Sequence, residues 1–460
     1  MTAWLARAVD FRRGEAPLAI LAALFHFFVL AGYYFLRPVR DAMGVSGGMD
    51  ELRWLFTATS IAALVFVIAF GGVVSRTNRR RFIPLAYLFV IVCLVGFAGL
   101  LIADARAGGG LIGSDTDTAL ARTVGYTFYV WLSVINLFIT SVLWAFMVDV
   151  FDVEQGKRLF PFVGVGGTLG GLFASKVAKL ASQSTHTVYL PVGLMLTGAA
   201  FFAAAIAVML WLDRTARRSL VSRLSGGAPA VGERSARASD EPIGGSLIEG
   251  LTAVLRSPYL LGIGGHIVLM AVSSTLIYFS GAHVVLENAQ TFDQRVRSFA
   301  DFDTLAQTAT LLTQLFITSR LIRRVGVGWT LAVLPLLTLL GFATLAIWPV
   351  FGVMAAFQAL QRAARYAVAR PSRETLFSVV PVAEKYKAKP VIDVFLYRGG
   401  DLAGAGLDGL LKAWGLGLTG LAAATLPIAA VWTALSLAMG RAQARRQKRA
   451  AESMAASKPT

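Results

Sequence analysis

Long apolar runs separated by short polar connections fill most of the chain. Each run approaches the roughly 20 residues that a helix needs to cross the hydrocarbon of a bilayer. Unbroken runs of this length indicate helices, because a membrane β-barrel would show shorter segments of alternating polarity. The predicted fold class is therefore an all-α polytopic membrane protein with about 12 transmembrane helices. The predicted spans form two sets of six: 18–36, 54–75, 82–103, 123–148, 159–181 and 188–212, then 258–284, 302–319, 329–348, 350–370, 390–412 and 416–440.

The composition agrees with lipid as the main solvent. Hydrophobic residues make up 56% of the chain and charged residues only 15%, whereas a soluble protein carries about 25% charged residues. The net charge of +17 does not predict a nucleic-acid partner, because the basic residues are not gathered into one patch. They lie instead on alternate connections, a positive-inside pattern that predicts cytoplasmic termini. These basic segments are the two chain ends and the connections 76–81, 149–158, 213–257, 320–328 and 371–389.

The two sets of spans carry related motifs. Residues 75–80 (SRTNRR) and 319–324 (SRLIRR) share one S-R-x-x-R-R spacing after the second and eighth spans. Residues 166–171 (GGTLGG) and 399–404 (GGDLAG) repeat a glycine pattern in the fifth and eleventh spans. Two parallel six-helix repeats are typical of the major facilitator architecture, in which the substrate binds near the midplane between the halves.

The repeats predict four segments along the chain. Residues 1–212 form an N-terminal six-helix bundle, 213–257 a cytoplasmic linker and 258–440 a C-terminal six-helix bundle. The linker is polar and rich in glycine, serine and arginine, which is typical of a flexible connection. Residues 441–460 form a basic cytoplasmic tail whose expected partners are anionic lipid headgroups. No protein partner is indicated.

The first candidate site is the segment Arg37-Pro38-Val39-Arg40-Asp41 at the end of the first span. Pro38 is expected to end or kink the helix and to free backbone groups there. A membrane-embedded arginine costs roughly 3 kcal/mol or more, so it tends to face a cavity or a partner. Arg37 and Arg40 therefore form either an anion site, since guanidinium groups suit phosphate, or an interfacial pair that Asp41 compensates.

The second candidate site lies in the eleventh span, where Arg398 stands near two acids. Helical spacing places Asp401 on the same face as Arg398 and leaves Asp393 off it. The group is either a ligand site or an internal ion pair that joins two helices.

A third polar group follows one face of the tenth span. Residues three and four apart on a helix share a face, which points here at a water-filled path or at neighbouring helices. Arg365 and Gln361 are the candidate ligands in this group. Its members are Gln358, Gln361, Arg362 and Arg365.

The remaining motifs have structural interpretations. The glycines of 164–170 resemble a phosphate-binding loop, but no strand precedes them, and close helix packing is favoured. His266 could serve a proton relay, although a structural role is favoured. No arrangement predicts catalysis, a metal site or a cofactor, so the chain is not expected to be an enzyme. The basic connections are predicted to form a gating latch: Arg76, Arg79, Arg80, Arg320, Arg323 and Arg324.

Three segments resemble the ATP/ADP translocase family, the nucleotide transporters of obligate intracellular bacteria and plastids with relatives in free-living bacteria. They are YYFLRPVRDAMGV at 33–45, KRLFPFVGVGGTLGG at 157–171, and the stretch 370–404, which begins RPSRETLF and ends LYRGGDLAG. The resemblance implies a twelve-span, facilitator-like exchanger of nucleotides. Arg40 and Arg398 match the places of two family lysines, so the charge is retained while the donor geometry changes.

The resemblance also has a departure. Two membrane glutamates of the family have no counterpart here, because the fourth, fifth and seventh spans contain no acid within their apolar stretches. Arginines without compensating acids would favour an anionic, phosphorylated solute. The favoured prediction is therefore an exchanger of a nucleotide or similar anion in a bacterial cytoplasmic (inner) membrane.

Two other functions stay open at the level of sequence. One is a proton-coupled facilitator for an unrelated organic solute, with Asp401 or His266 in the relay. The other is a membrane scaffold that transports nothing, which would tolerate neutral residues at Arg40 and Arg398.

Overall fold

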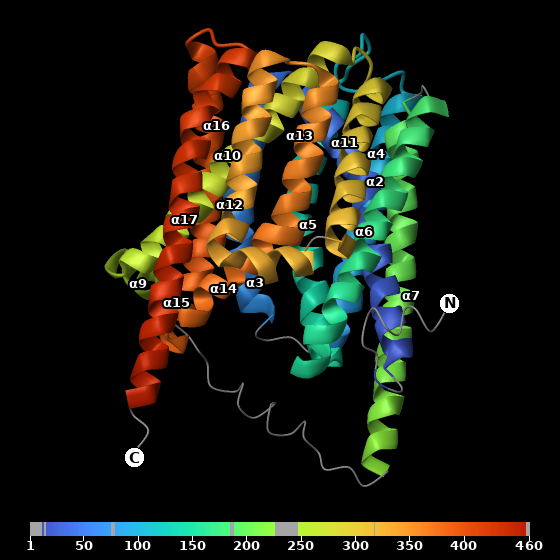
Figure 1. Ribbon diagram of the computed structural model, residues 1–460. Helices are drawn as coiled ribbons and strands as arrows, with labels where there is room; N and C mark the ends of the chain where they lie inside the picture. Colours follow the sequence, from blue (N-terminus) through green and yellow to red (C-terminus); the bar gives the residue numbers. More distant parts are fainter. Residues whose placement is uncertain are drawn as a thin grey trace. The chain divides into compact units, whose positions relative to one another are not determined.

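The computed structural model describes residues 12, 15–74, 79–184, 188–225, 247–316 and 318–456 (Figure 1). Its regular elements are helices, apart from an isolated β-bridge between Gly110 and Asp117. The prediction of an all-α polytopic membrane protein is confirmed. Seven helices of the described part are long and apolar enough to cross a membrane by length and composition.

The first six predicted spans correspond to six long helices, each longer than the apolar run that predicted it. These are α2 (Ala16–Ser46), α3 (Met49–Val74), α4 (Arg79–Arg106), α5 (Ala119–Val150), α6 (Val153–Ser184) and α7 (Leu190–Ser225).

The second set is more broken. The predicted spans 350–370 and 390–412 each contain a π-helical stretch, and α12 has a non-helical residue at Gly326, where φ is 77°. The elements are α9 (Leu247–Arg256), α10 (Pro258–Asn288), α11 (Phe292–Phe316), α12 (Thr318–Ile347), α13 (Phe351–Ala363), η1 (Ala364–Ala369), α14 (Arg370–Leu376), η2 (Phe377–Val379), α15 (Val382–Pro390), η3 (Val391–Leu396), α16 (Tyr397–Ala413) and α17 (Leu418–Ala456).

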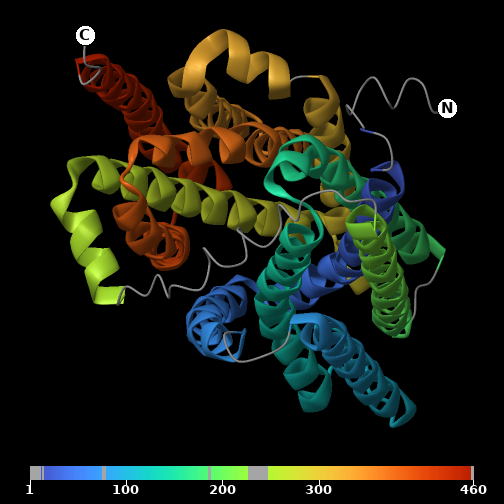
Figure 2. The same cartoon turned by 90° about the horizontal axis from the view of Figure 1, so that it is seen from below.

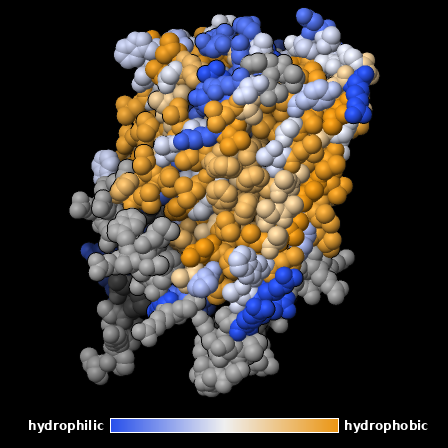
Figure 3. Space-filling view, turned by 90° about the vertical axis from the view of Figure 1, so that its right-hand side faces the viewer, coloured by the Kyte–Doolittle hydropathy of each residue, from blue (hydrophilic) through white to orange (hydrophobic). Residues whose placement is uncertain are grey.

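Large apolar side chains lie on the outside of the helices. The face on the α7 side of Figure 1 is covered by apolar side chains over most of its height, with polar side chains near its ends (Figure 3). Exposed apolar side chains on α4 follow the same rule, since Leu85, Phe89 and Val92 are each more than half exposed. Such a surface is unfavourable in water and suits the hydrocarbon of a bilayer.

The helices form two compact units that exchange short segments. Unit 1 comprises the described residues of 1–51, 61–242 and 289–307, and unit 2 those of 52–60, 243–288 and 308–460. Helices α3 and α11 are therefore each divided between the units. The division into an N-terminal bundle, 1–212, and a C-terminal bundle, 258–440, was predicted from the repeated motifs and stays a prediction.

Glycines allow close helix packing within each unit. In unit 1, a Cβ on Gly166 of α6 would stand 2.3 Å from the carbonyl oxygen of Ala23 on α2, and one on Gly170 would stand 2.2 Å from that of Phe27. In unit 2, Gly400 of α16 approaches the backbone of α10 in the same way. The packing interpretation of the glycines of 164–170 is confirmed for Gly166 and Gly170, whereas a Cβ on Gly164 would meet no atom within 4 Å.

Short helices gather at one end of unit 2 (Figure 2). Helix α9 lies beside α15 and beside the start of α10. Two ion pairs hold this end together: Lys387 Nζ lies 2.7 Å from Glu249, and Lys389 Nζ lies 2.6 Å from Glu374. Burial alone would raise the pKa of Glu374, but the hydrogen bond and charge of Lys389 lower it below its ordinary value.

A comparable network closes one end of unit 1. Gln155 and Asp152 form a reciprocal capping box at the start of α6, with hydrogen bonds of 2.8 and 3.1 Å. Gln155 and Arg158 also donate to the carboxylate of Glu15, which precedes α2. Burial would raise the pKa of Glu15, but these hydrogen bonds and that of the Arg12 amide outweigh it and lower the pKa to about 2.

Candidate functional site

The arginines of the first candidate site lie on the last turns of α2. We expected Pro38 to end or kink the helix here, and the expectation of an end is wrong, because α2 continues to Ser46. Proline removes one backbone donor, and the buried surroundings of Pro38 hold the helix in place despite this loss. Arg37 and Arg40 are thus presented by continuous helix, with side chains only 13% and 12% exposed.

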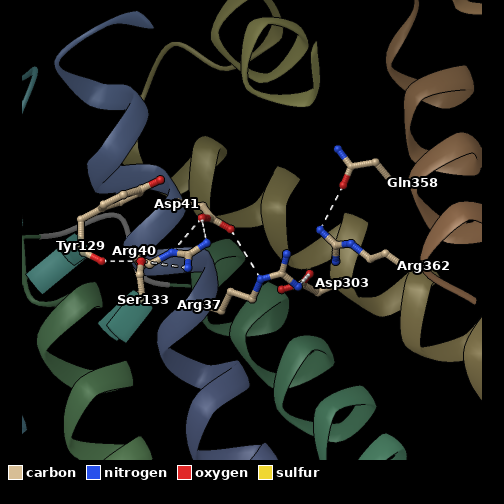
Figure 4. A network of polar contacts seen from close by, with 8 residues as sticks. All are labelled: Arg37, Arg40, Asp41, Tyr129, Ser133, Asp303, Gln358 and Arg362. Atoms are coloured by element: carbon tan, nitrogen blue, oxygen red, sulfur yellow. Dashed lines mark hydrogen bonds and ion pairs between the residues drawn. The ribbon is translucent and has the colours of Figure 1, made fainter. Parts of the chain in front are cut away.

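Each of these arginines has a carboxylate partner within unit 1 (Figure 4). Arg37 Nη1 donates to Asp303 Oδ1 of α11 at 2.5 Å, and its Nε lies 3.8 Å from Asp41. Arg40 donates to Asp41 through Nε at 3.0 Å and to Ser133 Oγ of α5 at 3.2 Å. The Arg40 guanidinium also lies 5.2 Å from the ring centre of Tyr129, a cation–π contact. The expectation of opposing arginines without compensating acids is wrong, because Asp41 pairs with Arg40 and Asp401 pairs with Arg398.

Asp303 is the functional candidate that the sequence analysis missed. It is 266 residues from Arg37, near the start of the eighth predicted span, in the sequence DFDT. In the sequence, an acid at the boundary of a predicted span looks like part of the polar connection beside that span. Its burial, at 1% exposure, is visible only in the folded chain.

Unit 2 contains the second group of arginines, and Arg365 is its most unusual member. Arg365 Nη2 donates to the hydroxyl of Tyr397 at 2.5 Å, and Nη1 donates to Ser274 Oγ at 3.0 Å. The rings of Tyr366 and Tyr397 lie 5.8 and 5.7 Å from its guanidinium carbon. Among the described residues, its hydrogen-bond partners are neutral hydroxyls, and the charge of Asp401 acts on it without a hydrogen bond.

Arg398 is paired as the helical spacing predicted. Its Nη1 donates to Asp401 Oδ2 at 2.9 Å, and Thr275 of α10 donates to the other carboxylate oxygen at 3.3 Å. Asp393 points elsewhere, 3.6 Å from Arg373. On the tenth predicted span, two members of the predicted polar face contact each other, since Arg362 Nη2 donates to Gln358 Oε1 at 3.1 Å. Gln361 of the same face is buried.

The arginines of unit 2 lie beside irregular helix. Arg365 is part of the π-helical stretch η1, and Tyr397 directly follows the π-helical stretch η3. A π-turn adds a residue to the helical repeat and changes the direction of neighbouring side chains, and such turns are frequent at functional sites. Sequence periodicity gave no signal for either stretch.

The histidines and the basic connections do not extend the site. His266 Nδ1 accepts a hydrogen bond of 3.1 Å from the indole Nε1 of Trp432, which can only donate. This buried contact favours the structural interpretation of His266 over a proton relay. Among the described residues, no three His, Cys, Asp or Glu side chains are grouped to hold a metal. The predicted latch arginines lie outside the described residues, or their side chains do: Arg76, Arg79, Arg80, Arg320, Arg323 and Arg324.

Solved structures of transporters share the fold of this chain. The nucleoside transporter NupG is 15% identical, with a TM-score of 0.55 over 94% of this chain and 99% of that chain. A bacterial homologue of the iron transporter ferroportin, in an inward-facing state, is 13% identical, with a TM-score of 0.63 over 93% of this chain and 100% of that chain. A POT family transporter in complex with 5-aminolevulinic acid is 11% identical, with a TM-score of 0.59 over 93% and 96%. Identities this low show the fold alone, which is major facilitator-like.

The family is shown by sequence. No curated protein sequence matches the chain significantly. A family model described as the TLC ATP/ADP transporter matches residues 113–347, just over half of the chain, and confirms the family; of the three segments that carried the resemblance, 157–171 lies inside the match. The chain is a transmembrane transporter that belongs to the TLC ATP/ADP transporter family.

Proposed function

We propose that this transporter moves an anionic, phosphorylated solute, a nucleotide such as ATP or ADP, by exchange through alternating access. The observation that carries the proposal is the environment of Arg365. Its guanidinium is partly buried and is held by Tyr397 and Ser274, neither of which carries a charge. Asp401 acts on Arg365 through its charge alone, so the N–H groups of the guanidinium are not committed to a carboxylate and can bind an anion.

The chemistry of the side chain favours phosphate in particular. A guanidinium presents several N–H groups in one plane and binds phosphate oxygens through two parallel hydrogen bonds. The flanking rings of Tyr366 and Tyr397 limit the directions in which Arg365 can turn. A site that is oriented before the substrate arrives loses less entropy on binding.

The family supports the choice of a nucleotide. Arg40 and Arg398 stand at the places of two family lysines, and both keep a positive charge close to buried carboxylates. We propose that Arg40 and Arg37 bind the solute in unit 1, and that Arg398, Gln361 and Asp401 bind it in unit 2. We further propose a bacterial inner-membrane location with both termini cytoplasmic, on the strength of the basic connections.

The test is uptake into proteoliposomes of labelled ATP, ADP and other phosphorylated solutes, with and without unlabelled nucleotide inside. The informative variant is Arg365→Gln, and the matched control is Arg217→Gln, since Arg217 pairs with Asp213 on α7 and is half-exposed. We expect saturable uptake that requires internal nucleotide and is lost in Arg365→Gln but kept in Arg217→Gln. Absence of uptake for every phosphorylated solute, from folded protein, would refute the proposal.

One alternative has a structural observation in its favour. Asp401 is a buried carboxylate beside Arg398 and Thr275, and a buried carboxylate can carry a proton across a membrane. Proton coupling predicts that uptake follows an imposed pH gradient and that Asp401→Asn abolishes this response. Uptake that does not change with the pH gradient and that requires internal nucleotide would exclude proton coupling.

A further inference from the structure

The first part of α11 is attached to unit 1 by polar side chains. Residues 292–307 of this helix belong to unit 1, whereas residues 308–316 belong to unit 2. Arg295 Nη1 donates to Ser46 Oγ at the end of α2 at 2.9 Å. Lys179 Nζ of α6 lies 2.6 Å from Asp301, and Arg37 lies 2.5 Å from Asp303. Contacts of this kind can be exchanged for contacts with a polar solute, unlike the interlocked apolar packing of a core.

The pair of Arg37 and Asp303 differs from the other attachments because it involves a site arginine. Both side chains are buried, with 13% and 2% of their surfaces exposed. Separating a buried ion pair is unfavourable unless each charge finds a new partner. A phosphate group supplies that partner for Arg37, because it offers the guanidinium the same kind of oxygen acceptor that Asp303 offers.

We infer that Asp303 is an internal counter-anion. It pairs with Arg37 in the empty transporter, and the transported anion displaces it from this pair. The inference rests on the proposed function and adds a coupling role for one residue. While Asp303 holds Arg37, residues 292–307 stay attached to α2. When a phosphate binds Arg37, Asp303 is released and α11 can move. The empty protein then cannot reorient, because Asp41, which lies 3.8 Å from Arg37, is already paired with Arg40 and does not replace Asp303. Transport therefore requires a solute in both directions.

The test compares two neutral variants of α11 in proteoliposomes, measuring uptake of labelled ADP into vesicles with and without internal ADP. Asp303→Asn removes the counter-anion, and Asp301→Asn is the matched control, since it removes an ion pair from the same helix that involves no site arginine. A merely structural role of α11 attachment would affect both variants alike. Asp303→Glu retains the charge and should behave as the wild type does.

We expect Asp303→Asn to raise uptake into empty vesicles by about tenfold or more, which corresponds to at least 1.4 kcal/mol of lost attachment. It should also lower the half-saturating ADP concentration, because the internal competitor for Arg37 is gone. Asp301→Asn should still depend on internal ADP. The inference would be overturned if uptake by Asp303→Asn still required internal ADP. It would also be overturned if both variants lost this requirement equally.

Two further arms separate the possible failures. If the wild type does not exchange ADP, the proposed function fails, and this outcome is distinct from an exchanging wild type with an unaltered Asp303→Asn. If Asp303→Asn does not fold, the double variant Arg37→Gln, Asp303→Asn removes both charges and leaves no buried ion unpaired. It should transport with weaker affinity and without dependence on internal ADP, and retained dependence would overturn the inference.

Discussion

Replacing Gly166 with alanine should force helices α2 and α6 apart. The new Cβ would lie 2.3 Å from the carbonyl oxygen of Ala23 and 2.8 Å from its carbonyl carbon. These are backbone atoms, which cannot rotate away as a side chain can. Ordinary contact begins near 3.4 Å, so the helices must separate locally by roughly 1 Å, and overpacking of this kind costs about 1–3 kcal/mol.

Gly164 provides a control two residues away on the same helix. A Cβ at Gly164 would have no other atom within 4 Å. Alanine there should stabilise α6 by up to about 1 kcal/mol, because glycine is the weaker helix former. Both variants gain the same helix propensity, so they should differ by the overpacking cost, about 1–3 kcal/mol in the free energy of unfolding, with Gly166→Ala the less stable of the two.

The measurement is reversible unfolding in mixed micelles of a mild detergent and dodecyl sulphate, followed by circular dichroism. Transport should change with stability, because α2 carries Arg37 and Arg40. Equal stabilities for Gly166→Ala and Gly164→Ala would refute the argument that Gly166 permits the close approach of α2.

Three other variants test separate contacts. The folded pKa of Glu15 is about 2 and its ordinary value is 4.5, so its contribution to stability is complete above pH 4.5 and is lost as the pH falls toward 2. Between pH 7 and pH 3 the free energy of unfolding should therefore fall less in Glu15→Gln than in the wild type. Arg53→Gln leaves the fully buried carboxylate of Asp408 without its 2.7 Å ion pair and should cost about 3–5 kcal/mol, whereas the double variant with Asp408→Asn should recover most of that loss in the same assay. Tyr397→Phe removes one hydrogen bond that orients Arg365 and should raise the half-saturating solute concentration by about tenfold; an unchanged value would contradict the role given to Arg365.

The helices could be predicted from sequence because their signal is local. A membrane span is an apolar run of sufficient length, and the runs at 18–36 and 123–148 indeed belong to α2 and α5. The glycines of 164–170 were assigned to packing for a similar reason, since small residues four apart on a helix lie on one face and allow close approach. The broken spans were not predicted, because hydropathy does not distinguish a π-helical turn from an α-helical one.

The site was harder to predict, because its charges are balanced by residues distant in sequence. The pair of Arg398 and Asp401 lies three residues apart on one helix and follows from helical geometry. The pair of Arg37 and Asp303 depends on the placement of α11 against α2, which no local pattern specifies. Arg365 was recognised as a candidate, but its neutral partners, which set its chemistry apart, come from α10 and α16.

The resemblance implies that arginines stand at positions 40 and 398 where the family has lysines, and this balance of charge gives a physical reason for arginine there. An ammonium group is a compact charge that one close carboxylate largely satisfies, whereas a guanidinium presents five N–H donors in a plane. Arg398 gives one Nη1 contact to Asp401 among the described residues. Its remaining donors lie in the same plane and can reach a second oxygen acceptor without breaking that pair. An arginine can therefore keep a buried carboxylate neutralised and still bind a phosphate, so a buried acid such as Asp401 is compatible with an anionic solute. On this argument Arg398→Lys should weaken uptake even though it conserves the positive charge, because lysine lacks the planar set of N–H donors.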